Sequence, residues 1–161
     1  MAIIRADWQD VLSPSGLGDD WSIIPTSYTA YSIVDYSGSF AVPGFRKRVQ
    51  KITRQARQTK DVGIYSNDFG ISEMRSNYQL EFWYRAYTLP LVVLRRYGSL
   101  YTQIGEYSAT YPSSTSAVQV IETIYGDGSP FNGLIFLMPS GKVTGTNFWF
   151  EIDRVSCREI I

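Results

Sequence analysis

Residues 78–87 alternate strictly between two kinds of side chain, and this pattern constrains the fold more than any other stretch. One set is apolar or aromatic and consists of Tyr78, Leu80, Phe82, Tyr84 and Ala86. The other set is polar, charged or aromatic and consists of Gln79, Glu81, Trp83, Arg85 and Tyr87. Successive side chains of a β-strand point to opposite faces of its sheet. The alternation therefore predicts a strand with one face in a core and the other toward solvent.

Further strand patterns recur at intervals of roughly 8–12 residues, separated by turns rich in Gly, Pro and Ser. They cover residues 28–42, 91–97, 100–111, 117–125, 133–138 and 145–161. We expect the segment 91–97 to pair with 78–87 as a hairpin or to lie beside it. Residues 133–138 are apolar at every position, which predicts a central strand covered on both faces. The spacing is typical of an all-β sandwich or barrel with little helix.

The stretch 145–161 alternates as well, and we expect Phe148, Phe150 and Ile152 to face the core. Cys157 is the single cysteine of the chain, so no intrachain disulfide can form. Its place in the final strand favours a small buried thiol over a reactive one.

Seven of the fifteen basic residues lie between positions 46 and 60, with no acidic residue among them, although the whole chain is neutral. The segment is interpreted as a solvated strand or helix face, or as a surface for an acidic protein partner. A nucleic-acid contact is a third interpretation, but no nearby aromatic or Gly-rich module supports it, so we expect no nucleic-acid partner. If the chain contains a helix, this is its best site, because Val49, Ile52 and Ala56 fit a helical period. The candidate partner-binding residues are Arg46, Lys47, Arg48, Lys51 and Arg54.

The chain of 161 residues is most simply one domain. Residues 1–27 are rich in turn-forming residues, so we expect an irregular N-terminal arm packed on a domain formed by 28–161. Trp8 and Trp21 either plug the end of the core or form an exposed contact surface. The N-terminus lacks the pattern of a signal peptide, and no apolar run is long enough to span a membrane. We therefore expect synthesis without a secretory signal and no membrane association.

Motifs for catalysis, cofactors and metals are missing from the sequence. There is no histidine, no phosphate-binding loop, no nucleophile elbow and no cysteine cluster. A glycosidase needs only two carboxylates, so Glu81 with Glu122 or Glu151 is the remaining catalytic option. We favour a non-enzymatic protein with no cofactor and no metal.

The order of elements resembles the galactose-binding-like jelly-roll family, which includes many carbohydrate-binding modules. Two stretches carry the resemblance: Tyr78-Gln-Leu-Glu-Phe-Trp-Tyr-Arg-Ala86 and Asn147-Phe-Trp-Phe-Glu-Ile-Asp-Arg-Val-Ser156. They are similar to the family's middle strand, Tyr-x-Leu-x-Phe-x-x-Arg-Ala, and to its aromatic last strand leading into Ile-Asp-x-Val-x-Leu. The likeness covers residues 75–160 well and the first 70 poorly. It implies a two-sheet antiparallel jelly-roll β-sandwich.

In that family, the solvent-facing side of the middle strand can line a glycan groove. The resemblance therefore implies ligand-binding residues at Gln79, Glu81, Trp83, Arg85 and Tyr87. Alternatively, Trp83 and Tyr87 are covered by loops or by a partner subunit. Asp153 matches the family's last-strand aspartate, which implies a structural role at the strand end or in a calcium site.

Two functions of different classes follow. The first is a virion structural protein of a tailed phage: a head decoration (cement) protein, or an accessory tail or baseplate subunit. Such a protein would be homo-oligomeric and assembled in the host cytoplasm. It would be attached to neighbouring capsid or tail proteins through the basic segment or through the N-terminal arm. The alternative is a carbohydrate-binding module or host-glycan adhesin that uses the solvent-facing side of strand 78–87.

Overall fold

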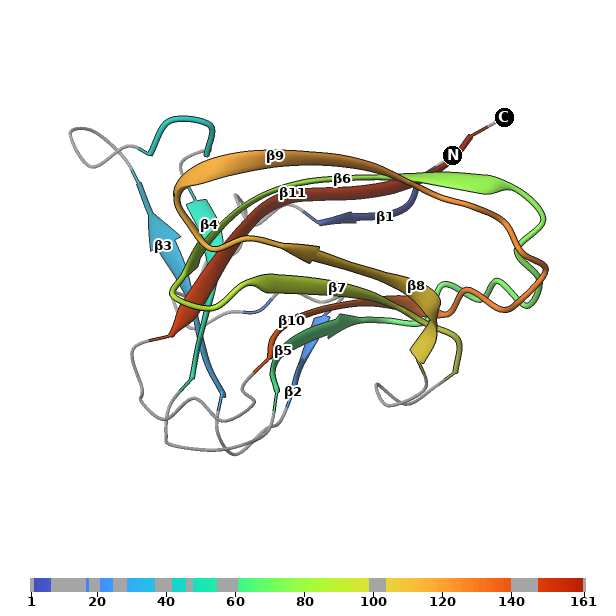
Figure 1. The fold of residues 1–161 in the computed structure, drawn as a ribbon, viewed down its shortest axis with the longest axis horizontal. Coiled ribbons are helices and arrows are strands. Elements are labelled where there is room, and N and C mark those ends of the chain that lie inside the picture. The colour runs from blue at the N-terminus through green and yellow to red at the C-terminus, as the bar shows by residue number, and fades with distance from the viewer. Residues whose placement is uncertain are drawn as a thin grey trace.

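Two antiparallel β-sheets lie face to face and enclose the core (Figure 1). The computed structural model describes residues 2–6, 17, 21–24, 29–36, 42–45, 48–54, 61–98, 104–139 and 148–160. Within these residues there is no helix, and so none that is long and apolar enough to cross a membrane. The prediction of an all-β, two-sheet antiparallel sandwich is confirmed.

The larger sheet has six strands. They are β1 (Ala2–Ala6), β3 (Thr29–Asp35), β4 (Arg48–Arg54), β6 (Asn77–Tyr87), β9 (Ser114–Ile124) and β11 (Trp149–Ile160). Their order is β3-β4-β11-β6-β9, and β1 pairs with β11.

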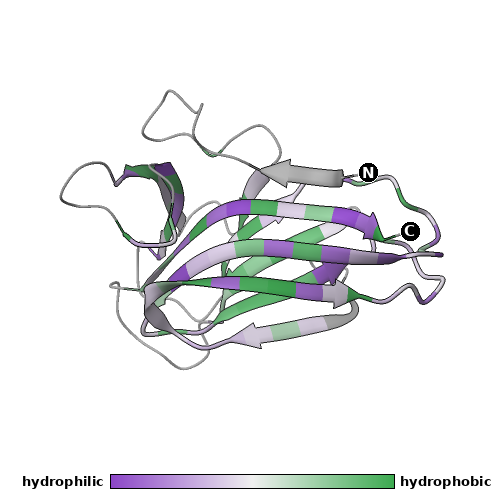
Figure 2. Ribbon diagram, turned by 90° about the horizontal axis from the view of Figure 1, so that it is seen from above, coloured by the Kyte–Doolittle hydropathy of each residue, from purple (hydrophilic) through white to green (hydrophobic). Residues whose placement is uncertain are grey.

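The smaller sheet has five strands. They are β2 (Trp21–Ile24), β5 (Val62–Ser66), β7 (Leu91–Arg96), β8 (Ile104–Tyr111) and β10 (Gly133–Met138). Their order is β2-β5-β10-β7-β8. Figure 2 shows hydrophobic and hydrophilic residues alternating along the strands.

Aromatic rings dominate the core between the sheets. The five residues predicted to face inward from β6 are all buried, with at most 6% of any of them exposed. Phe82 lies edge-on to Phe136 of β10, with ring centroids 5.2 Å apart. All six residues of β10 are buried, which confirms the prediction of a central, covered strand.

Segment 1–27 differs from the expected irregular arm, because it contributes β1 to the larger sheet and β2 to the smaller one. Trp21 is 5% exposed and packs edge-on against Phe136, with centroids 5.6 Å apart. Trp21 is therefore part of the core, as the plug interpretation predicts, whereas Trp8 lies outside the described residues. A strand of four residues such as β2 is too short to show a clear alternation in the sequence.

The predicted pairing of 78–87 with 91–97 is wrong. β6 belongs to the larger sheet and β7 to the smaller one, so the chain crosses the sandwich between them. The corner uses a positive φ of 72° at Thr88, and the Leu89 amide donates to the Tyr87 carbonyl at 2.9 Å. Alternation assigns a core face to each strand but does not specify the sheet to which the strand belongs.

The proposed helix site also differs, because residues 48–54 form the strand β4. Its inward side carries Ile52, fully buried, and Arg54, which is 1% exposed with its guanidinium 4.5 Å from the centre of the Phe148 ring. The basic segment is therefore not a single solvated face.

A β-bulge at Arg154 divides β11. Before it, Trp149–Ile152 pair with β4, and after it Val155–Arg158 pair with β1. The register with β6 shifts between Asp153 and Ser156, and Arg154 has a φ of 54°, which is uncommon for a residue other than glycine. The extra residue exchanges the two faces, so Val155 and Cys157 become the buried positions.

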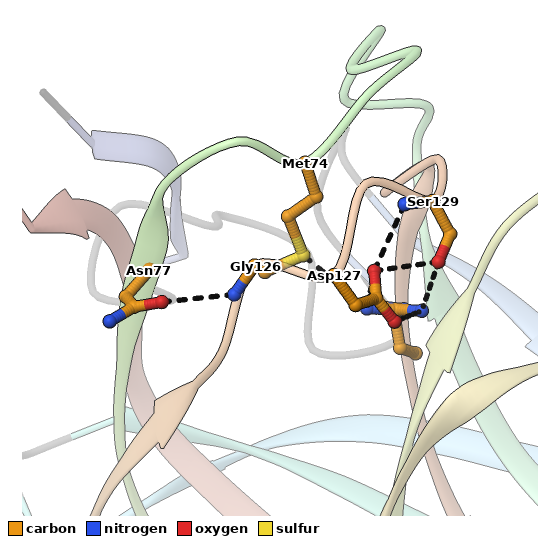
Figure 3. A network of polar contacts seen from close by, with 6 residues as sticks. Met74, Asn77, Gly126, Asp127 and Ser129 are labelled. Carbon is orange, nitrogen blue, oxygen red and sulfur yellow. Dashed lines mark hydrogen bonds and ion pairs between the residues drawn. The ribbon is translucent and has the colours of Figure 1, made fainter.

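Arg95 of β7 donates to the Met74 sulfur, to Asp127 and to Ser129, three residues that Figure 3 shows close together in two neighbouring loops. The Arg95 side chain is 2% exposed and forms a bidentate ion pair with Asp127, with N···O distances of 3.2 and 2.9 Å. It also donates to Ser129 at 3.2 Å, while Asn77 accepts the Gly126 amide at 3.0 Å. These contacts hold the segment before β6 against the segment after β9.

Candidate ligand-binding surface

The outer face of the larger sheet carries a cluster of rings and charges in two cross-strand rows. In the first row Tyr87 of β6 lies opposite Trp149 of β11, and in the second Arg85 lies opposite Glu151, which lies opposite Lys51 of β4. Tyr36, directly after β3, contacts the same group. We call these residues the outer cluster: Tyr36, Lys51, Arg85, Tyr87, Trp149 and Glu151.

Glu151 is the buried centre of the outer cluster, with none of its surface exposed. Arg85 Nε donates to Glu151 Oε1 at 2.7 Å, and the Tyr36 hydroxyl donates to Oε2. Arg85 also donates to the Thr115 carbonyl at 3.2 Å. A carboxylate removed from water needs such partners, because its desolvation is costly. Burial and the hydrogen bond to Glu151 raise the pKa of Tyr36 well above its ordinary value, so the phenol stays a donor.

The rings of Tyr87 and Trp149 stack in parallel, with centroids 5.7 Å apart and an interplanar angle of 6°. Lys51 Nζ lies 4.6 Å and the Arg85 guanidinium 5.1 Å from the centre of the Trp149 ring. Trp149 is therefore already engaged by three neighbours. Tyr87 is 38% exposed, which makes it the accessible ring of the outer cluster.

Trp83 lies on the same face but under the segment 42–45. A Cβ added to Gly44, whose φ is +92°, would be 2.5 Å from the Trp83 ring. The Arg154 guanidinium covers the ring at 5.0 Å from its centre, and it donates to the Gly44 carbonyl and, at 3.0 Å, to Asp153. This arrangement matches the alternative in which loops cover Trp83.

The remaining predicted ligand residues lie further along β6. Gln79 accepts two hydrogen bonds from Arg158 at 2.7 and 3.2 Å, and Glu81 is half-buried opposite Ser156. Glu81 is four residues from Arg85, about 13 Å along a strand. The structure thus places Arg85 and Tyr87 together, Trp83 beneath a loop, and Gln79 and Glu81 apart.

The same register bears on the glycosidase option. Glu151 lies opposite Arg85 and is therefore also about 13 Å from Glu81 along the strands, beyond the roughly 5–9.5 Å of glycosidase carboxylates. Glu122 lies opposite Leu80 and so on the other face of the sheet. Neither pair has the geometry of a glycosidase.

The predicted partner-binding residues do not share one surface. Lys51 lies in the outer cluster, Arg54 lies inside, and Arg48 is half-buried at the start of β4. Burial lowers the pKa of Arg54. Arg46 and Lys47 lie outside the described residues. Sequence reasoning missed Tyr36, Trp149 and Glu151 as neighbours of Arg85. The β6–β11 register brings Trp149 and Glu151 there, and the strand order β3-β4-β11-β6 brings Tyr36.

The residues that the structure describes contain no group of three or more His, Cys, Asp or Glu that could hold a metal ion. Asp153 is fully buried beside Arg154, which agrees with a structural role at the bulge.

No family model matches the chain, and no curated protein matches its sequence. Solved structures do match its fold. The CBM22-1 xylan-binding domain from Paenibacillus barcinonensis has a TM-score of 0.61 at 10% identity, over 99% of this chain and 95% of that one. A CBM4 carbohydrate-binding module has a TM-score of 0.56 at 19% identity, over 88% and 95%.

A third similar structure is the enzymatically active domain of tailspike protein 4 of bacteriophage CBA120. Its TM-score is 0.61 at 13% identity, over 88% of this chain and 20% of that one. These likenesses concern the fold. The chain therefore has the jelly-roll β-sandwich fold of carbohydrate-binding modules.

Proposed function

We propose that this protein is a non-catalytic glycan-binding domain whose contact surface is the outer cluster, with Tyr87 as the ring that meets the sugar. The observation that carries the proposal is the accessible Tyr87 ring held in parallel against Trp149. A fixed aromatic plane can stack on the C–H face of a sugar, and it loses little entropy on binding because its neighbour already holds it.

A sugar site also needs hydrogen-bonding groups for the sugar hydroxyls, and polar side chains beside Tyr87 supply them. Lys51 and the partly exposed Arg85 can donate to hydroxyl groups, while Glu151 keeps Arg85 in place. The fold likeness to a xylan-binding domain and to a CBM4 module supports the same class of ligand.

The experiment compares the wild type with Tyr87→Ala by isothermal titration and affinity electrophoresis against soluble xylans, β-glucans and a glycan array. We expect binding in the wild type and about a fivefold loss of affinity in the variant, since one stacked ring contributes on the order of 1 kcal/mol. Tyr125→Ala is the matched control, because Tyr125 is 71% exposed and lies outside the outer cluster. Equal binding by Tyr87→Ala and the wild type would remove this surface from consideration.

A second candidate function, a virion structural protein, is favoured by the likeness to a phage tailspike domain over 88% of this chain. In this proposal the sandwich is a head decoration or an accessory tail or baseplate subunit, located in the virion, and the outer cluster faces host glycans or a neighbouring subunit. The genes beside the coding sequence test it. Capsid or tail genes would support it, and a polysaccharide hydrolase operon would contradict it.

A further inference from the structure

β9 forms an open edge of the larger sheet. It pairs with β6 on one side, and no described strand pairs with its other side. It has eleven residues, whereas the other edge strands β1, β2, β3 and β8 have five, four, seven and eight. An unpaired edge presents a row of free N–H and C=O groups to any extended chain, and natural proteins usually block it with Lys, Pro or bulges.

Few of these protections occur along β9. The strand contains no proline and no basic residue, and Glu122 is its only charged residue. Its register against β6 shifts between Tyr84 and Ala86, so the irregular part is confined to the start of the strand. In the regular part, Val118–Ile124, the single inward-facing charge of Glu122 is the one such device.

The surface of the sandwich also has a cleft beside this edge. This cleft of about 450 Å³ is lined by Tyr84, Tyr111 and Pro112 on one side and by residues 118–122 of β9 on the other. The cleft forms because β8 and β9 follow each other in the chain but belong to different sheets. A strand added to β9 would cover it and bury the partly exposed Val118, which packs against the core.

We propose that β9 pairs antiparallel with β9 of a second copy of this chain, about a two-fold axis at Ile121. Ile121 is 55% exposed and lies at the middle of the regular segment, so this register sets it against its own copy. Glu122 of one copy then lies opposite Val120 of the other, so the two carboxylates are diagonal neighbours, about 7–8 Å apart, and are not directly opposed. Ile124 of one copy lies opposite Val118 of the other, above the cleft.

The side chains of β9 favour a second copy over another partner. In this register apolar Ile121 meets its own copy, apolar Ile124 meets Val118, and polar Gln119 meets Thr123. Since one strand pair buries less surface than the roughly 1,600 Å² of a stable interface, we expect a concentration-dependent dimer. The proposal does not depend on glycan binding, because β9 lies at the edge of the sheet and the outer cluster on the neighbouring strands.

Ile121→Cys tests the register directly. Residues directly opposite each other in an antiparallel pair have Cβ atoms about 4.5–5.5 Å apart, close enough for a disulfide after small adjustments. We expect mild oxidation to convert Ile121→Cys into a covalent dimer on a non-reducing gel. Gln119→Cys is the matched control: it is exposed on the same face of β9, but in this register its two copies are four residues out of step. The native Cys157 is fully buried and does not compete.

Light scattering on size-exclusion fractions supplies the second measurement. The wild type should approach the mass of two chains as concentration rises, and Ile121→Lys should stay at the mass of one. At concentrations where the wild type is monomeric, the two proteins should share one unfolding midpoint. A wild type that remains monomeric, a dimer that persists in Ile121→Lys, or equal cross-linking of the two cysteine variants would each overturn the proposal.

Discussion

The buried thiol of Cys157 makes the free energy of unfolding depend on pH in the alkaline range. The thiol lies on the inward face of β11 with no exposed surface, and burial raises its pKa from 9.0 to about 12. In the unfolded chain the thiol ionises above about pH 9, whereas in the folded chain it stays protonated. Unfolding then releases a proton, so alkaline pH favours the unfolded state.

We therefore expect the free energy of unfolding to fall by about 1.4 kcal/mol per pH unit above pH ~9, through loss of the Cys157 proton. Cys157→Ala should lack this part of the slope, although the lost sulfur lowers its stability by a constant amount. Urea unfolding of both proteins between about pH 8 and pH 10 measures the difference, because the tyrosines, which titrate near pH 10, contribute equally to both proteins. If the free energies of unfolding of the two proteins fell equally with pH, the thiol would not be buried as described.

The sequence predicted which face of a sheet a residue lies on, but not whether other parts of the chain bury it there. Alternation placed Trp83, Glu151 and Asp153 on the outer face of the larger sheet, which the register confirms. Glu151 and Asp153 are nonetheless fully buried there, and Trp83 lies under Gly44. Period-two patterning carries no information about a distant loop that folds over a strand.

At the scale of elements, two loops with different kinds of ion pair allow a matched comparison. Arg95 is buried and paired with Asp127, whereas Arg75 and Glu73 pair with 80% and 51% of their side chains exposed. Arg95 and Ser129 hold the pKa of Asp127 below its ordinary value. The Asp127 pair therefore stabilises the fold above the ordinary pKa near 4 and loses this effect as acid protonates the folded carboxylate.

We predict that Asp127→Ala lowers the free energy of unfolding at neutral pH by about 3 kcal/mol, because it leaves Arg95 buried without its counter-charge. Glu73→Ala should cost less than about 0.5 kcal/mol, since an exposed pair contributes little. Urea denaturation gives both values, and hydrogen exchange should report faster opening of residues 67–76 and 125–132 in Asp127→Ala. Similar losses in the two variants would contradict the assigned role of Arg95.

Elements with strong internal patterns were predictable, and their pairings were not. β6, β10 and β11 were recognisable from the sequence because each is long or uniformly apolar. The partners of β6 are β9 and β11, which are distant in the chain, and not its neighbour β7. The outer cluster depends on such a pairing, so the sequence indicated Arg85 and Tyr87 without their partners.

At the scale of the whole molecule, the N-terminal segment joins the two sheets into one cooperative unit. β1 adds to the larger sheet, β2 adds to the smaller sheet, and Trp21 fills the core between them. The boundary suggested by the sequence at residue 28 therefore passes through the packed sandwich.

We expect a chain of residues 28–161 to lose the cooperative unfolding transition of the full chain, measured by tryptophan fluorescence in urea. Trp21→Ala in the full chain separates the core contribution from the strand pairing, and it should cost about 3–5 kcal/mol. If residues 28–161 unfold at the same urea concentration as the full chain, the segment is a dispensable arm after all.

The strand order has a consequence for how the chain acquires its fold. β10 and β11 follow every other described strand in the sequence, yet each occupies an interior position: β10 between β5 and β7, and β11 between β4 and β6. While the chain is being synthesised, the earlier strands exist without the neighbours that will join them. The strands on either side of β10 and of β11 cannot be joined into a sheet until that interior strand has been synthesised. Folding must therefore wait for the last third of the chain, and non-local pairings of this kind form slowly.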